Sequence, residues 1–196
     1  LLQSTPISPG ASGRIQLVLE KPIAASEGDK FILRDTTSQR TIGGGRFLDL
    51  RAPQRHRKTP ERQRALDAHA ERDHAKALSA LLQCSPYFID IETFARDRAL
   101  TAQEFTATLE IVGAALLGTD ARIAVARQTR RSLGDDILAA LKKFHAVNPS
   151  ARGITFDRLR LELATRVPAK FFQALIQTMA KAGEISLEGG VISASD

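Results

Sequence analysis

The sequence predicts a multidomain α+β protein, in which a short all-β segment is followed by two copies of one helical unit. Three observations support this fold class. Apolar residues alternate with polar ones before residue 50, and they recur at helical spacing after residue 59. The same order of three helices and a hairpin then appears twice, and this order is typical of a winged helix.

The all-β segment covers residues 14–50. A period-2 pattern at Ile15, Leu17 and Leu19 ends at Lys21-Pro22. Further strands are expected at 31–34, 40–42 and 47–50, and three glycines, Gly43, Gly44 and Gly45, suggest a β-bulge or a close backbone approach. So few strands cannot bury two faces. We expect the sheet to stay open at one edge, to pair with a second copy, or to be completed by the residues before Arg14.

The first helical repeat starts at Thr59, a favourable N-cap that precedes Pro60. One helix, or two broken near Asp73, should reach about Leu82. A short helix carrying Phe88, Ile91 and Phe94, a third helix capped by Thr101, and a hairpin over 114–126 with its turn at Gly118-Thr119-Asp120 should follow.

The second repeat follows Ser132 with the same order. Apolar residues predict helices over 137–147 and 156–163, and a third helix from Pro168 to Gly183. The dipeptide Gly189-Gly190 then predicts a tight hairpin.

Composition excludes several classes. The chain has 196 residues and a hydrophobic share of 43%, as in a globular protein. No apolar run approaches the roughly 18 residues of a membrane span, and no secretory signal is present. Cys84 is the single cysteine, which excludes an intrachain disulfide and fits a reducing cytosol. Because the chain opens on Leu1 rather than Met, we expect a piece of a longer protein.

The net charge of +6 is concentrated between Arg51 and Arg64, where six bases face one acid, Glu61. With no apolar periodicity and two prolines, this stretch is expected to be an exposed, mobile linker. Its cluster of Arg51, Arg55, Arg57 and Lys58 predicts weak, salt-sensitive, sequence-blind RNA affinity, with a log-log salt slope near roughly −3. The alternative is a purely solvated linker. A smaller cluster is Arg127, Arg130 and Arg131.

Catalytic signatures are missing from the sequence. The glycine triplet lacks the spacing of a dinucleotide fingerprint, and no glycine-rich loop ends in Lys-Ser or Lys-Thr. His69 and His74 lie five apart, outside the usual metal-ligand spacings. No serine nucleophile elbow occurs. We therefore expect no catalytic residue, no metal site and no cofactor in this chain.

The stretch Glu27-Gly-Asp-Lys-Phe-Ile-Leu-Arg-Asp35, followed by Arg40-Thr-Ile-Gly-Gly-Gly-Arg46, resembles the end of the third domain of a translational GTPase. Together with the Pro- and Arg-rich passage from Arg51 to Arg64, it is similar to the bacterial selenocysteine-specific elongation factor family. The resemblance implies the end of a third-domain β-barrel over 1–52, a basic linker over 53–58, and winged helices over 59–129 and 130–196.

The resemblance also implies a function for the parent protein. Such a factor is a cytoplasmic GTPase that uses GTP and Mg²⁺ to bring selenocysteinyl-tRNA to the ribosome at UGA codons, recruited by an mRNA hairpin. This chain lacks the GTPase part and the last winged helices. In the family the barrel contacts tRNA, and the matching loop over 35–40 offers Ser38, Gln39 and Arg40 as candidate contacts. An ordinary solvated loop is the alternative.

A winged-helix DNA-binding transcription regulator is the competing function, and an unrelated interaction module is a third. DNA reading needs a basic third helix. Glu104 and Glu110 on the first third helix would repel phosphate. The second offers only Lys170, Gln173, Gln177 and Lys181. We therefore expect the two repeats to act as a spacer, with an ordered connection over 127–133 and no exposed apolar patch.

Overall fold

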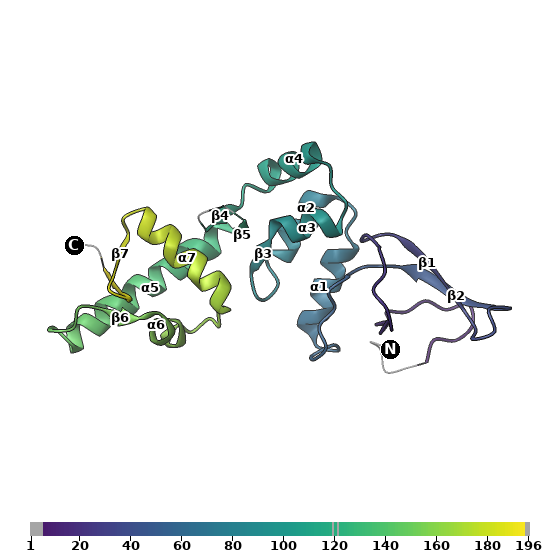
Figure 1. Cartoon of the computed structure of the whole chain (residues 1–196), viewed down its shortest axis with the longest axis horizontal. Helices are drawn as coiled ribbons and strands as arrows, with labels where there is room; N and C mark the ends of the chain where they lie inside the picture. Colours follow the sequence, from purple (N-terminus) through teal and green to yellow (C-terminus); the bar gives the residue numbers. More distant parts are fainter. Residues whose placement is uncertain (1–5, 119, 121, 195–196) are drawn as a thin grey trace. The chain divides into compact units, whose positions relative to one another are not determined.

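The computed structural model describes residues 6–118, 120 and 122–194, and Figure 1 shows the order of the elements. The chain forms two compact units: the first compact unit contains Leu1–Cys84 and Thr93–Thr108, and the second contains Ser85–Glu92 and Leu109–Asp196. The elements are β1 (Lys30–Arg34), β2 (Thr41–Arg46), α1 (Pro60–Ala70), α2 (His74–Leu81), β3 (Phe88–Asp90), α3 (Ile91–Asp97), α4 (Ala102–Val112), β4 (Ala115–Leu117), β5 (Ile123–Val125), α5 (Arg127–Val147), β6 (Ile154–Thr155), α6 (Phe156–Glu162), α7 (Ala169–Lys181), β7 (Ile185–Glu188) and β8 (Val191–Ala194). Among the described residues, no helix is long and apolar enough to cross a membrane.

The β segment is an open hairpin. In the described part of the chain, β1 pairs antiparallel with β2 and with no other strand, so the expectation of an open edge is confirmed. The strands expected at 15–19 and 47–50 are wrong, since neither stretch is assigned as a strand. A period-2 pattern sets which side chains face inward, but a strand also needs a hydrogen-bonded neighbour.

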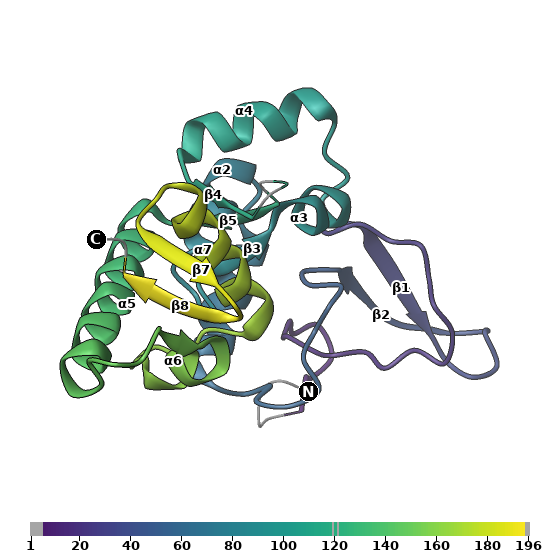
Figure 2. The ribbon, with the colours of Figure 1, turned by 60° about the vertical axis from the view of Figure 1, so that its left-hand side comes forward.

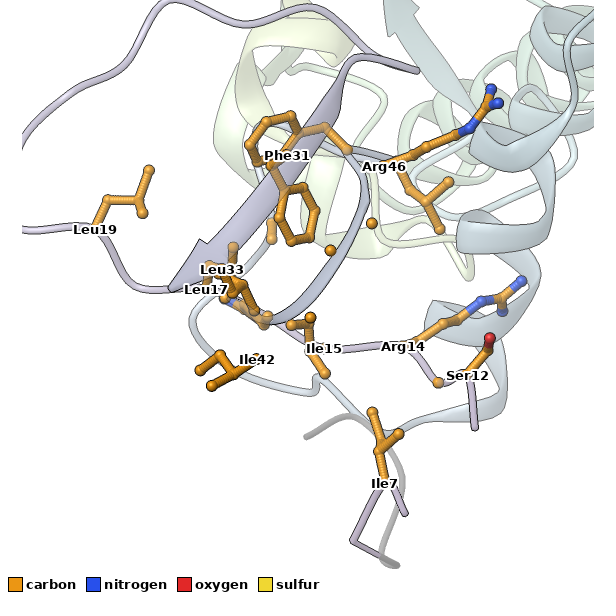
Figure 3. A pocket seen from close by; sticks show the side chains of 18 of the residues that line it. Ile7, Ser12, Arg14, Ile15, Leu17, Leu19, Phe31, Leu33, Ile42 and Arg46 are labelled. Atoms are coloured by element: carbon orange, nitrogen blue, oxygen red, sulfur yellow. The ribbon is translucent and has the colours of Figure 1, made fainter. Parts of the chain in front are cut away.

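Side chains on one face of the hairpin line an open hollow of about 1240 Å³. Figure 3 shows Phe31 and Leu33 of β1 on its wall, with Ile15 and Leu17 from the preceding segment. Ile15 and Leu17 therefore face inward as the alternation predicts, although the segment forms no strand. On the other face Ile32 is 69% exposed, so that face of the hairpin is open.

The glycines of β2 allow the two strands to approach closely, as the sequence predicts. A Cβ atom on Gly44 would lie 2.8 Å from the Phe31 carbonyl oxygen, and one on Gly45 would lie 2.7 Å from the Phe31 ring. Side chains at these positions would therefore force the Phe31 backbone or ring to move. The pairing register also shifts between Leu33 and Arg34, which is the expected bulge or irregularity.

The first helical stretch is two helices, and it is broken at Asp73 as predicted. Thr59 caps α1, its Oγ1 accepting from the Arg62 amide at 3.2 Å, and Pro60 occupies the first turn. Asp73 caps α2 by accepting from the Lys76 amide at 2.8 Å. This hydrogen bond holds the pKa of Asp73 below its usual range.

Phe88 lies in a strand, so the prediction that it belongs to the short helix is wrong. Phe88 pairs with Val125 in a sheet of order β3-β5-β4, and α3 starts only at Ile91. Hydrogen bonding to β5 accounts for the extended backbone here, a long-range contact that local spacing does not reveal. The expected hairpin of β4 and β5 is present, although Thr119 of its turn lies outside the described residues.

The second repeat has the expected helices and hairpin, plus one short strand that the sequence did not reveal. The strand β6 pairs with β8 in a sheet of order β6-β8-β7. Gly189 and Gly190 both have positive φ, at 57° and 81°, which the tight turn between β7 and β8 requires. Figure 2 shows this hairpin beside α5 and α7.

One apolar core runs through the second compact unit. It joins residues of the first repeat's sheet to residues of the second repeat's helices and sheet. Its members with at most 1% exposure are Leu117, Val125, Ile137, Leu141, Ile154, Leu159, Phe172, Leu175, Met179 and Ile192. The sheet of the first repeat and the whole second repeat therefore stabilise each other through shared burial.

Two helix ends allow a matched stability prediction. Ala99 (φ 51°) and Gly183 (φ 74°) occupy the same left-handed position, where the next amide bonds back to a carbonyl five residues earlier, Leu100 to Ala95 and Glu184 to Met179, both at 2.9 Å. Because a Cβ is strained there, Ala99→Gly should raise the free energy of unfolding by about 0.5 to 1 kcal/mol, and Gly183→Ala should lower it by about 1 kcal/mol. Urea titration measures both, and shifts of the same sign would contradict the assignment.

Candidate nucleic-acid interface

The loop between β1 and β2 is held by Asp35. Its Oδ1 accepts from the Thr37 hydroxyl at 2.9 Å, from the Gln39 amide at 3.1 Å and from the Arg40 amide at 3.4 Å. The Ser38 amide donates to the Asp35 carbonyl at 3.0 Å, and Ser38 has a positive φ of 57°. The loop is therefore a closed turn with a defined backbone.

These contacts change the titration of Asp35. The Thr37 hydroxyl and then the Arg40 and Gln39 amides hold the pKa of Asp35 below its usual range, because all three donate to the ionised carboxylate. A lowered folded-state pKa means that this support is present above the ordinary pKa of an aspartate. It is lost as the pH falls through the lowered value. The turn therefore keeps its hydrogen bonds at neutral pH.

The three candidate loop contacts lie together at the end of the hairpin. Ser38, Gln39 and Arg40 are all exposed, and each is within the turn that Asp35 closes. Arg34 adds a further contact, because its Nη1 donates to the Ser38 carbonyl at 3.1 Å. The arrangement presents a hydroxyl, an amide and a guanidinium from a preformed loop, which are groups that bind phosphate and sugar oxygens.

The basic linker divides into free and engaged cations. Arg55, Arg57 and Lys58 are exposed, and none of them forms an ion pair with a carboxylate in the described part of the chain. Arg51 is different, since its Nε and Nη2 donate to the two oxygens of Asp97 at 2.7 and 2.8 Å. Three of the four candidate linker cations are therefore open to a phosphate without first breaking an ion pair.

The interpretation of residues 51–64 as a wholly exposed, mobile linker is wrong for its second half. Arg62 and Arg64 lie on α1, and Arg62 forms an ion pair with Asp49 at 2.7 Å in which both side chains are about nine-tenths buried. The N-cap at Thr59 and Pro60 starts α1 inside the basic stretch. In the structure, residues 47–59 connect β2 to α1.

The third helix of the first repeat, α4, opens with an acidic cap. Glu104 Oε2 accepts from the Thr101 amide at 2.9 Å and the Thr101 hydroxyl at 2.7 Å, and Thr101 Oγ1 accepts from the Glu104 amide at 3.2 Å. The Thr101 amide is the main cause that lowers the pKa of Glu104. The carboxylate therefore stays charged where a groove-binding helix would need to approach phosphates.

The third helix of the second repeat, α7, is covered along one side by the first repeat's sheet. Phe171 stacks on Phe88 of β3 with ring centroids 5.3 Å apart. Thr178 Oγ1 accepts from the Gly118 amide at 3.0 Å. Lys170 Nζ donates to Asp90 at 2.9 Å, so one of the two lysines considered for DNA reading is already paired. These contacts cover the side of α7 that carries Phe171 and Thr178, whereas Gln173 and Lys181 stay exposed.

The connection between the two repeats over 127–133 is ordered, as predicted, and it is part of a helix. The helix α5 begins at Arg127, two residues after β5 ends, and continues to Val147. Arg127 Nε donates to the Gly113 carbonyl at 2.5 Å, and Arg130 forms an ion pair with Glu184. Arg127 and Arg130 are therefore used inside the second compact unit, and Arg131 of the same cluster is exposed.

Comparisons with known proteins place both ends of the chain in one family. The model described as "Selenocysteine-specific elongation factor, beta-barrel domain" matches residues 1–54, and the model described as "Elongation factor SelB, winged helix" matches residues 138–193. The two matches occur in the order that the structure shows for the hairpin and the second repeat. The chain belongs to the SelB family.

Two curated relatives support the SelB assignment. The selenocysteine-specific elongation factor of Escherichia coli (strain K12) is 27% identical over 184 residues, which cover 92% of this chain and 29% of that protein. The factor of the same name from Desulfomicrobium baculatum is 24% identical over 199 residues, covering 95% of this chain and 30% of that protein. The chain thus spans less than a third of the SelB relatives it matches.

The SelB matches bracket the candidate residues. The loop 35–40 and Arg51 fall within the barrel match, and Arg55, Arg57 and Lys58 follow directly after it. Sequence reasoning missed a cluster at the junction of the barrel and the helices, where ligand atoms of Glu27, Asp49 and His69 lie within 4.8 Å of one another. No local spacing could reveal it, since its members come from distant parts of this SelB chain.

Proposed function

We propose that this chain is the part of a selenocysteine-specific translation elongation factor that joins the tRNA-facing barrel to the mRNA-binding end. The whole factor would bring selenocysteinyl-tRNA to the ribosome at UGA codons in the cytoplasm, using GTP and Mg²⁺ held outside this chain. The observation that carries the proposal is the order of the two family matches, a SelB barrel followed by a SelB winged helix. The names of the curated relatives support the same function.

Within that factor, the two repeats would serve as a stiff spacer. The continuous α5, the shared core and the contacts between α7 and the first sheet support this role, because each opposes bending between the first repeat's sheet and the second repeat. The covered side of α7 and the capped Glu104 disfavour the alternative of a DNA-binding regulator. We propose domain limits of 1–52, 53–58, 59–129 and 130–196 for the barrel part, the linker and the two winged helices.

The chain by itself should neither bind nor hydrolyse GTP. It has no glycine-rich phosphate loop ending in Lys-Ser or Lys-Thr, the element that cradles the phosphates in such enzymes. Isothermal titration of the chain with GTP and Mg²⁺ should give only heats of dilution. Saturable binding at micromolar GTP would show that the division of labour proposed here is incorrect.

The basic linker should give the chain weak RNA affinity with little sequence preference. Replacing Arg55, Arg57 and Lys58 with Ala removes three open cations, which should flatten the log-log salt slope for unfractionated bacterial tRNA by about 2. The matched control removes the same charge from the second repeat, as Lys142→Ala, Lys143→Ala and Lys181→Ala, three exposed lysines. Equal slopes for the two triple variants would reduce the linker to a solvated connection.

The same assay separates the contribution of the loop to tRNA affinity from that of the linker. Replacing Ser38, Gln39 and Arg40 with Ala removes one charge and two neutral hydrogen-bonding groups, so affinity should fall about tenfold while the salt slope changes by less than about 1. Because these side chains are exposed and Asp35 still closes the turn through backbone amides, the fold should be unchanged. Undiminished tRNA affinity would remove the loop from the interface.

A further inference from the structure

Ion pairs join the barrel segment to the first helices on either side of residues 53–58. From the barrel segment come Glu27, just before β1, and Asp49, just after β2. From the helices come Arg62 and His69 on α1 and Arg98 after α3. All five belong to the first compact unit, and their side chains are between 5% and 18% exposed.

Arg98 is the centre of this group. Its Nε lies 3.0 Å from Glu27 Oε2, and its Nη2 and Nη1 donate to the carbonyls of His69 at 2.9 Å and Glu71 at 3.0 Å. The guanidinium also lies over the Phe94 ring, 5.3 Å from its centroid. One buried side chain thus contacts the barrel segment, the end of α1 and α3 at once. A fixed fork of donors satisfies such a set only in one arrangement of its partners.

Further contacts act in parallel. His69 Nδ1 lies 2.8 Å from Glu27 Oε1, and Arg62 pairs with Asp49 at 2.7 Å. The Glu27 amide donates to the Asp97 carbonyl at 2.6 Å. The β1–β2 hairpin is therefore held at both of its ends. Glu27 before β1 and Asp49 after β2 contact groups on α1 and groups at or after the end of α3.

The balance of charge in this group favours a structural role over metal binding. Glu27, Asp49 and His69 have a donor set that suits a cation, but each carboxylate already faces a guanidinium. Two arginines balance two carboxylates and would repel a divalent ion. Separating the pairs would leave charges buried without a counter-charge, which is costly.

We propose that Arg98 with Glu27, and Arg62 with Asp49, form a latch that makes the barrel segment and the helices α1 to α3 one rigid body. Residues 53–58 then act as a connection and not as a hinge, and the loop 35–40 points in a fixed direction relative to α1 and α2. The latch is a geometric property of the chain and needs no RNA contact. Its failure would therefore leave the proposed tRNA-facing role untouched, and the converse also holds.

Distance measurement between spin labels tests the latch in the full chain. Labels at the exposed positions Thr36, in the loop, and Ser79, on α2, are combined with Cys84→Ala to remove the native thiol. Electron–electron resonance should give one narrow distance distribution. It should stay narrow from about 0.1 M to about 1 M salt, because buried pairs are screened little. A broad distribution, or one that broadens with salt, would overturn the latch.

Variants on the barrel side then open the latch while leaving the helices' own contacts in place. Glu27→Ala with Asp49→Ala should broaden the distribution about twofold, since both buried pairs are lost. The control Asp67→Ala removes a carboxylate that is 67% exposed and pairs with Arg14, and it should leave the width unchanged. A double variant that keeps its helical circular dichroism and its narrow distribution would overturn the proposal.

Two further measurements complete the test of the latch. If the double variant loses its helical signal, Glu27→Gln alone decides the question, because it removes the charge but keeps the shape. An unchanged width in that folded variant would overturn the latch, and an increased width would support it. Addition of Mg²⁺ or Zn²⁺ to the unsubstituted chain should change nothing, and a metal-induced change in the distance would reassign the cluster as a cation site.

Discussion

Replacing Arg98 with Ala should lower the free energy of unfolding of the first compact unit by about 3 to 5 kcal/mol. Its side chain is only 5% exposed and pairs with Glu27, which is itself 7% exposed. Removing it leaves a buried carboxylate without that partner and takes a donor from the last carbonyls of α1. The loss is therefore larger than that of an ordinary hydrogen bond, at about 1 kcal/mol.

Chemical denaturation followed by circular dichroism measures this loss. The matched control is Arg96→Ala, an exposed arginine on α3, which should change stability by less than about 0.5 kcal/mol. Arg98→Lys should fall between the two, because lysine keeps the charge but not the planar fork. A loss below about 1 kcal/mol for Arg98→Ala would mean that water replaces the guanidinium at little cost.

Replacing Phe88 with Ala should destabilise the second compact unit by about 3 to 5 kcal/mol. Phe88 is 2% exposed in β3, stacks on Phe171 of α7 and belongs to the core shared by both sheets. The cavity would open where the two repeats meet. Because that core is common, protection from hydrogen exchange should fall in β7 and β8 as well as in β4 and β5.

The control for Phe88 is an apolar residue outside the core. Ile111, at the end of α4, is 74% exposed, so Ile111→Ala should change stability by less than about 0.5 kcal/mol. The informative outcome for Phe88→Ala is where protection is lost. If β7 and β8 kept full protection while β4 and β5 opened, the two repeats would be independently stable, and the spacer would be jointed.

Local signals in the sequence were enough for most helices and turns. Thr59 with Pro60, Asp73 and Gly189-Gly190 each specify a cap or a turn through their own backbone and side-chain chemistry. What failed depends on partners far away in the chain. Ile15 and Leu17 alternate with polar residues as in a strand, but no strand pairs with their segment. Phe88 is part of a strand because β5 pairs with it.

The candidate site divides in the same way. The exposed loop and linker cations are visible in the sequence, because exposure and charge are local properties. The latch is not visible, since Glu27 and Arg98 come together only in the folded unit. The contact of α7 with the first sheet was also missed. Phe171 and Thr178 lie beside the buried core residues of α7, and their partners Phe88 and Gly118 belong to the other repeat.

The helix α5 starts only two residues after β5 ends. The number of residues at this point therefore sets how far the second repeat is rotated about the α5 axis, relative to the first repeat's sheet. Each residue added to an α-helix turns everything beyond it by about 100° and advances it by about 1.5 Å. One residue inserted between Val125 and Arg130 would therefore swing Phe171 away from Phe88, even if every side chain in both repeats were kept. Changes of length at this point should therefore damage the contact between the first repeat's sheet and α7 far more than changes of residue type.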